Sequence, residues 1–102
     1  MTAATLSDRA RRELLAAAEW IAEDNRIAAE GLIEAVEAAA KRIGAHPQIG
    51  RRRPELAKGP YRFLTLTAYP YLIAYAENET PPIIVRIVHG ARDLPRVLQD
   101  LP

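Results

Sequence analysis

The sequence contains no cysteine, which excludes disulfide bonds and thiolate metal sites. Its only two histidines, His46 and His89, lie far apart in the chain, so we expect no metal site and no cofactor. No apolar run approaches the ~18 residues that span a membrane. The N-terminus also lacks the charged-then-apolar order of a signal peptide. We therefore expect a cytoplasmic protein with no membrane partner.

Aromatic residues are scarce and the net charge is only +1, but the charge is unevenly distributed. Residues 47–102 carry eight Lys or Arg against five Asp or Glu, whereas residues 1–46 carry six against eight. The stretch 51–62 alone holds five basic residues and one acid. Such a patch can attract an acidic partner, although a solvated basic loop is the simpler interpretation. With 6% aromatic residues, we expect no direct sequence-specific binding of nucleic acid.

The first half of the chain predicts two helices joined by a very short connection. Ser7 or Asp8 can cap the first helix, and Asp24 or Asn25 can cap the second. Two such amphipathic helices form an antiparallel hairpin. Each has one apolar face at the three-four spacing, formed first by Ala10, Leu14, Ala17 and Ile21, and then by Ala29, Leu32, Val36, Ala39 and Ile43.

Two further expectations concern single residues of this hairpin. Trp20 lies near the edge of the first apolar face, and we expect it to be part of the core. Gly44, with Pro47 shortly after it, should end the second helix.

The second half of the chain reads as strands. Residues 61–67, 71–76 and 83–89 are rich in β-branched and aromatic residues, and short turns between them predict an antiparallel meander. Residues 3–6 form a possible first strand, and residues 93–102 a short final helix. The order β-α-α-β-β-β-α predicts a two-layer α+β fold, with the helical hairpin packed on one face of a mainly antiparallel sheet. We expect a single domain over residues 1–102.

This order, together with three stretches, resembles the ParE branch of the RelE/ParE toxin superfamily of bacterial toxin–antitoxin operons. The stretches are LSDRARRELLAAAEWIAEDN (6–25), HPQIGRRRPEL (46–56) and PYLIAYAENETPPIIVRIVHGARD (70–93). The resemblance covers almost the whole chain, although Arg26 stands where the family often has proline. It implies a RelE/ParE-like fold and a toxin that a ParD-like ribbon-helix-helix antitoxin neutralises in a hetero-oligomeric complex.

The resemblance implies two possible activities. ParE-type members inhibit DNA gyrase and so block replication, whereas RelE-type members cleave mRNA on the ribosome with basic groups and a C-terminal tyrosine or histidine. Of the positions that would carry that chemistry, Arg62 and Arg92 are present, but Leu64, Leu72 and Leu98 occupy the others. Because each such group contributes ~10²–10³ to the rate, we expect neither an enzyme nor any catalytic residue. A RelE-type nuclease, and an inactive member that only binds its antitoxin, remain the alternatives.

The segment RIVHGARD (86–93) concentrates polar groups after an apolar strand. Strand alternation predicts Val85, Ile87 and His89 on one face and Arg86 on the other. His89 could be a general base, but a half-buried histidine bonded to the backbone is the favoured interpretation.

Two charged residues of this segment also have local explanations. Arg86 needs a buried partner, for which we expect Glu13, Glu19 or Asp93, and exposure toward a target is its second interpretation. Asp93 is expected to cap the final helix. Arg92 has no such local need, which makes it the best functional candidate of the segment.

Two sets of site residues follow from these arguments. The candidate target-binding residues are Arg51, Arg52, Arg53, Arg62, Arg86 and Arg92. The candidate antitoxin-binding residues are Leu14, Ala18, Trp20, Ile21 and Leu98. For the antitoxin we expect an apolar groove flanked by basic residues, which an amphipathic acidic segment can fill.

Overall fold

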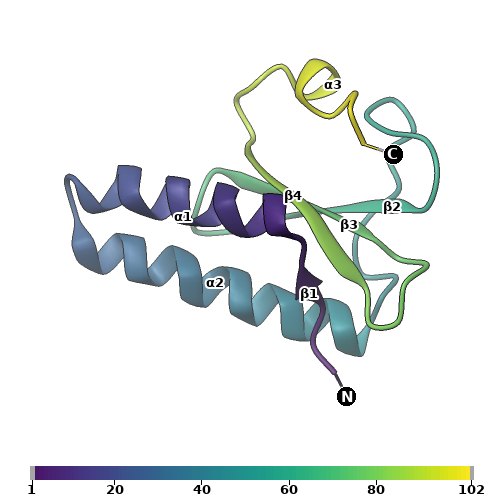
Figure 1. The fold of residues 1–102 in the computed structure, drawn as a ribbon, viewed down its shortest axis with the longest axis horizontal. Coiled ribbons are helices and arrows are strands. Elements are labelled where there is room, and N and C mark those ends of the chain that lie inside the picture. The colour runs from purple at the N-terminus through teal and green to yellow at the C-terminus, as the bar shows by residue number, and fades with distance from the viewer. Residues whose placement is uncertain (1, 102) are drawn as a thin grey trace.

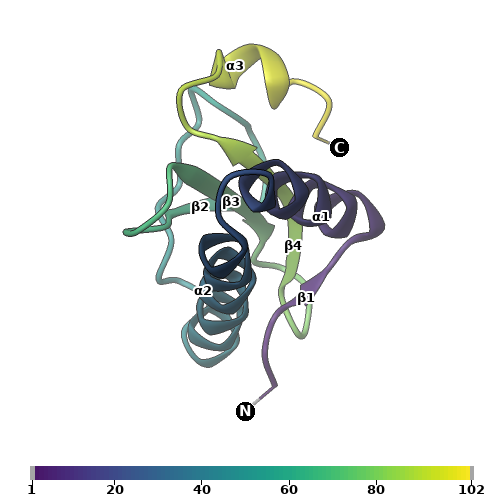
Figure 2. The same cartoon turned by 90° about the vertical axis from the view of Figure 1, so that its left-hand side faces the viewer.

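The computed structural model describes residues 2–101 and arranges them as a pair of helices beside a sheet (Figure 1). Figure 2 shows α1 and α2 nearly end-on, with the short α3 lying apart from both. The predicted α+β order is confirmed: β1 (Thr5–Leu6), α1 (Asp8–Ala22), α2 (Arg26–Ala45), β2 (Tyr61–Thr65), β3 (Tyr71–Ala76), β4 (Ile83–His89) and α3 (Leu94–Val97). No helix within residues 2–101 is both long and apolar enough to cross a membrane.

The helices begin where the sequence predicts. The Ser7 side chain accepts a hydrogen bond from the Ala10 N–H at 3.1 Å, and Asn25 accepts one from Ala28 at 3.0 Å. These caps satisfy N–H groups that the first turn of a helix leaves without partners. The predicted apolar faces are buried, except that Ile21 is only half-buried.

α2 ends at Ala45, between Gly44 and Pro47 as predicted, but Gly44 itself lies within the helix and does not cap it. Its role is steric. A Cβ atom at this position would lie 2.1 Å from the Thr2 carbonyl oxygen and 2.7 Å from the Ala3 Cα. The glycine therefore lets the N-terminal segment pass directly against the helix.

The prediction that Trp20 belongs to the core is wrong, since the residue is 71% exposed. Figure 1 shows the reason: the tip of the α1–α2 hairpin extends beyond the end of the sheet. Ile27, which opens α2 near the same tip, is likewise 81% exposed. The last turn of α1 thus has no sheet beneath it, and helical periodicity alone cannot reveal where the opposing layer stops.

The sheet is mixed and has the strand order β1-β4-β3-β2. β2, β3 and β4 form the predicted antiparallel meander, and β1 adds to β4 in parallel. β1 is shorter than the predicted 3–6, because the Ala4 N–H bonds to the Ala40 carbonyl of α2 at 2.9 Å instead of joining the sheet.

A register shift interrupts the pairing of β3 with β4. Ala74 lies opposite Arg86, but Tyr75 lies opposite Ile84, so Val85 is an extra residue in β4. An extra residue of this kind reverses the alternation of side chains beyond it.

The shift corrects the predicted faces of β4. Ile84 and Ile87 both pack in the core beneath the helices, whereas Val85 packs on the other side of the sheet. Val85 therefore does not share a face with Ile87 and His89, as simple alternation predicted.

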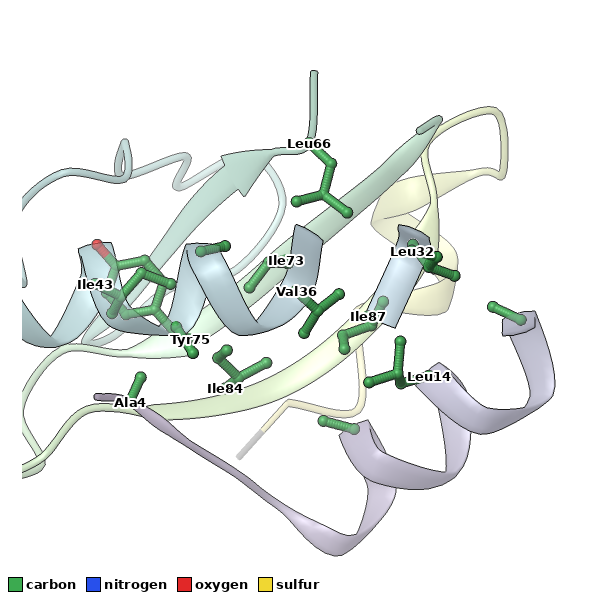
Figure 3. Packing of buried hydrophobic residues seen from close by; sticks show 14 residues of the cluster. Ala4, Leu14, Leu32, Val36, Ile43, Leu66, Ile73, Tyr75, Ile84 and Ile87 are labelled. Carbon is green, nitrogen blue, oxygen red and sulfur yellow. The ribbon is translucent and has the colours of Figure 1, made fainter. Parts of the chain in front are cut away.

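The first core lies between the helices and the sheet. Figure 3 shows Leu32, Val36 and Ile43 of α2 over Ile73 and Ile84 of the sheet. Side chains of this kind each stabilise the fold by about 1.5–3 kcal/mol when fully buried.

A second core covers the opposite face of the sheet. Phe63, Leu72 and Val88 project there and meet Leu56 of the loop and Leu98 of the tail. Leu98 is only 1% exposed, so the C-terminal tail is anchored on this face. α3 itself is short, and Asp93 stands at its N-cap position without the predicted side-chain hydrogen bond.

Candidate binding surfaces

A groove of about 440 Å³ opens between α1, α2 and the N-terminal segment. Arg11 of α1 and Lys41 of α2 line it together with Glu37, and Leu15, which is 50% exposed, brings apolar surface to it. The remaining lining is apolar: Ala3, Ala4, Leu6, Leu14, Ile33, Val36 and Ala40. The groove is therefore mainly apolar, and each helix contributes one basic residue to it. An apolar groove with basic residues beside it is what we expect an amphipathic acidic segment of the antitoxin to fill.

The residues predicted to bind the antitoxin only partly coincide with this groove. Leu14 lines it but is 8% exposed, and Ala18 is buried in the hairpin. Trp20 is exposed and Ile21 half-buried, outside the groove lining. Leu98 is buried beneath the sheet, on the face opposite the helices. The structure thus does not bring these five residues together.

Sequence reasoning missed most of the groove lining. The basic residues Arg11 and Lys41 flank the apolar faces of their helices, which is a signal that could have been used. The contribution of Ala3, Ala4 and Leu6 carries no such signal, because it depends on where the N-terminal segment lies against α2.

The arginine triplet, Arg51 to Arg53, lines a separate hollow of about 340 Å³. Its other lining residues are Glu55, Phe63, Thr65 and Leu72. Phe63 and Leu72 belong to the second core, so this hollow lies on the sheet face away from the helical hairpin. Arg51 is fixed by a pair of backbone hydrogen bonds with Phe63, at 2.8 and 2.9 Å.

The loop that carries the triplet is also held by the side chains of buried Tyr75 and half-buried Arg62. The Tyr75 hydroxyl donates a hydrogen bond to the Pro47 carbonyl at 2.6 Å and accepts one from the Gly50 N–H at 2.9 Å. Arg62 donates to the Gly50 carbonyl at 2.9 Å. Burial raises the pKa of Tyr75, so its hydroxyl keeps its proton. The basic loop is therefore held in place rather than only solvated.

Two carboxylates offset part of the charge around the triplet. Glu77 pairs with both Arg52 and Arg62. Glu55 accepts a hydrogen bond from Arg53 at 3.0 Å. The pKa of the Glu55 carboxyl is lowered, mainly by a hydrogen bond from its own backbone N–H and then by the bond from Arg53. The Arg51 guanidinium makes no side-chain bond to any residue between 2 and 101.

Arg86 lies in the interior, with 4% exposure, and each of its three guanidinium nitrogens has a partner. Its Nη2 lies 2.9 Å from Glu13 Oε2, which confirms one of the three predicted partners. Its Nη1 donates to the Val97 carbonyl at 2.6 Å and to Asp100 Oδ1 at 3.0 Å. The structural interpretation of Arg86, as a residue paired inside the protein, is thus confirmed. Asp100, its second carboxylate partner, was not among the predicted ones.

His89 and Arg92 line a third hollow of about 240 Å³, between α1 and the end of β4. His89 is half-buried, and its Nδ1 accepts a hydrogen bond from the Ala91 N–H at 3.0 Å, as the favoured interpretation predicts. Its ring meets Tyr71 edge-on at 5.3 Å. Arg92 is exposed and bonds through its side chain to none of the described residues.

Leu64, Leu72 and Leu98, which stand where RNA-cleaving relatives would carry reactive groups, all pack in the two cores. Leu72 and Leu98 are buried in the second core, and Leu64 packs partly buried against the first. The remaining two cations are apart, because Arg62 bonds to the loop at Gly50 whereas Arg92 lines the hollow at the end of β4. Within residues 2–101, no cluster of three metal-ligating side chains occurs.

Comparison with known proteins adds the family. The model of a family described as "ParE toxin of type II toxin-antitoxin system, parDE" matches residues 4–94. The chain belongs to this family. It is a ParE-type toxin of a type II toxin–antitoxin system, and an antitoxin is therefore its partner.

A solved structure supports the ParE fold independently. A chain titled "Chromosomal ParDE TA system from P. aeruginosa" superimposes with a TM-score of 0.71, over 87% of this chain and 96% of that one. The two sequences are 19% identical, so this likeness concerns the fold. No curated protein matches the sequence.

Proposed function

We propose that this ParE-family toxin inhibits DNA gyrase and so blocks replication, as a binding protein of the cytoplasm and not as an enzyme. We take residues 1–102 as one toxin domain. The observation that carries the proposal is the packing of Leu64, Leu72 and Leu98. Since these positions would bear the charged and proton-transferring groups of the nuclease branch, the chain lacks most of what RNA cleavage needs.

The proposed target surface consists of exposed or partly exposed arginines. Arg51, Arg52, Arg53 and Arg62 gather around the loop at the β2 edge, and Arg92 lies beyond the end of β4. Arg52 and Arg53 form ion pairs with exposed guanidinium groups, and such pairs contribute little to stability, so these two arginines can exchange a carboxylate of the chain for one of a partner. Arg86 is left out, because its donors are occupied in the interior.

For the antitoxin, we propose a ParD-like ribbon-helix-helix protein whose amphipathic tail fills the groove between α1 and α2, giving a hetero-oligomeric complex. The apolar lining would take the apolar side of the tail, and Arg11 and Lys41 would meet its acidic residues.

The groove assignment can be tested with Leu15→Glu and Ile33→Glu. Both place a charge in the lining, and we expect each to weaken antitoxin binding at least tenfold, about 1.4 kcal/mol. Ile27→Glu is the matched control, because Ile27 is exposed but does not line the groove. Isothermal titration with the antitoxin encoded by the adjacent gene measures the difference. Equal losses in all three variants would place the antitoxin elsewhere.

The function is tested by expressing the chain alone in a bacterial host and then together with its adjacent gene. We expect growth arrest with a block in DNA synthesis, relieved by co-expression. Ribosome-associated mRNA is sequenced in the same cells. Cuts in mRNA with continued DNA synthesis would support the nuclease alternative, and unaffected growth would support a member that only binds its antitoxin.

A further inference from the structure

The hollow at the arginine triplet has the features of a binding site for a small anionic group. Arg51, Arg52 and Arg53 together line one space of about 340 Å³, which is within the range of sites for small ligands. Phe63 and Leu72, which are buried, and Thr65, which carries a hydroxyl group, also line it.

Many donors in this hollow are not used by the protein. A guanidinium group carries five N–H donors. Arg52 bonds Glu77 through Nη2 and Arg53 bonds Glu55 through Nε, while the Arg51 side chain bonds none of the described residues. Arg62 also pairs with Glu77, so the four arginines 51, 52, 53 and 62 have only two carboxylates between them. The lining of the hollow, three arginines against Glu55, keeps a net positive charge.

The loop is held in position before any ligand arrives. Its backbone is bonded to Phe63 at Arg51, to the Tyr75 hydroxyl at Gly50 and Pro47, and to Arg62 at Gly50. Binding to such a loop costs less conformational entropy than ordering a mobile basic segment would.

We infer that this hollow binds a phosphodiester of a nucleic-acid strand, without reading its sequence. Planar guanidinium forks match phosphate oxygens. The space exceeds what a single carboxylate fills. The inference builds on the proposed action against gyrase, an enzyme that works on DNA, and assigns to the toxin its own contact with the strand.

The position of the hollow fits this role. It lies on the sheet face away from the helical hairpin, whereas the proposed antitoxin groove lies between the helices and the N-terminal segment. One surface can therefore hold the antitoxin while the other holds the phosphodiester.

The test uses the purified full chain and a fluorescein-labelled single-stranded DNA of mixed sequence, with anisotropy measured over a range of salt. We expect Arg51→Ala to weaken binding roughly tenfold. The slope of the logarithm of the binding constant against the logarithm of salt concentration should fall by about 1, which corresponds to the loss of one phosphate contact. Arg26→Ala is the control, because Arg26 is an exposed arginine of α2 and its loss changes the net charge equally. Thermal melting checks that both variants fold.

Two results would overturn the inference. If Arg26→Ala weakens binding as much as Arg51→Ala, the interaction reflects net charge and not this hollow. If a glutamate peptide of matched charge competes as well as unlabelled DNA, the site accepts acidic protein in place of phosphate. No gyrase is present in the assay, so its outcome is independent of whether the toxin inhibits that enzyme.

Discussion

The Glu13 carboxylate of α1 is joined to Arg86 of β4 and to the backbone beside it. Arg86 Nε donates to both carboxylate oxygens, at 3.1 and 3.0 Å, and the Ile87 N–H donates to Oε1 at 2.9 Å. The same guanidinium bonds the Val97 carbonyl and Asp100. One carboxylate and one guanidinium thus link the first helix, the sheet and the tail.

Replacing Glu13 should therefore be among the costly single changes in this chain. We expect Glu13→Ala to lower the free energy of unfolding by about 3 kcal/mol, because it leaves the Ile87 N–H without an acceptor and removes the carboxylate that meets Nε and Nη2 of the buried Arg86. Glu13→Gln keeps an oxygen for Ile87 and should cost less. Urea unfolding followed by circular dichroism measures both.

Glu19→Ala is the matched control for this change, since Glu19 is an exposed carboxylate on the same helix. It should stay within about 0.5 kcal/mol of the parent. A loss at Glu13 no larger than at Glu19 would show that the Arg86 network does not hold the tail and helix together.

Tyr75 should make stability depend on alkaline pH. Burial raises the pKa of its phenol above the ordinary value of 10.0, although the Gly50 N–H and Arg62 act in the opposite direction. The stability that the neutral phenol contributes is therefore complete below pH 10.0 and is lost as pH rises through the raised pKa. Tyr75→Phe should cost about 1–3 kcal/mol at neutral pH, because Gly50 and Pro47 lose their partner.

The measurement is the difference in unfolding free energy between the parent and Tyr75→Phe, from pH 7 to pH 11. We expect it to shrink above pH 10. Burial also raises the pKa of Tyr61, but Tyr61 is present in both proteins and cancels in the difference. A difference that stays constant through pH 11 would contradict the link between Tyr75 ionisation and stability.

Gly44→Ala should be destabilising, although alanine normally improves a helix interior by about 1 kcal/mol. The added Cβ would lie 2.1 Å from the Thr2 carbonyl oxygen, and backbone cannot yield as a side-chain tip can. We expect a net loss of about 1–3 kcal/mol, seen as a lower melting temperature.

Gly31→Ala provides the comparison for this steric effect. There the added Cβ would meet the Tyr69 hydroxyl at 2.3 Å, and Tyr69→Phe removes the clashing atom. The double variant should therefore recover stability relative to Gly31→Ala alone. A melting temperature for Gly44→Ala at or above that of the parent would show that the N-terminal segment does not press on α2.

Trp20 provides an intrinsic probe of the hairpin tip, because it is the only tryptophan in the chain. Its exposure of 71% predicts the emission of a hydrated indole and efficient quenching by iodide. Trp20→Ala should change the free energy of unfolding by less than about 0.5 kcal/mol. If the sequence-based assignment of Trp20 to the antitoxin interface holds, adding the antitoxin shifts the emission to shorter wavelength. Unchanged emission in the complex would refute that assignment.

The sequence predicts this fold well where neighbours along the chain determine the outcome. The spacing of Leu32, Val36 and Ile43 on α2, and the caps at Ser7 and Asn25, require no knowledge of distant residues. Strands at 61–67, 71–76 and 83–89 follow from the same local signals, and the structure retains all three with only the first shortened.

Predictions failed where contacts with residues distant in sequence determine the burial or the role of a residue. Trp20 is exposed because the hairpin extends beyond the sheet, and Gly44 is required because the N-terminal segment lies against α2. The extra residue at Val85 changes which side chains of β4 share a face, and nothing in the local pattern marks it. The groove is likewise built from three separate elements.

Gyrase supercoiling in the presence of the purified toxin tests the central proposal most directly. We expect inhibition of supercoiling that increases with toxin concentration and disappears when the antitoxin is added in equal amount, with no cleavage of ribosome-bound mRNA by the same preparation. Undiminished supercoiling together with clear cuts in ribosome-bound mRNA would contradict the assignment of this toxin to gyrase.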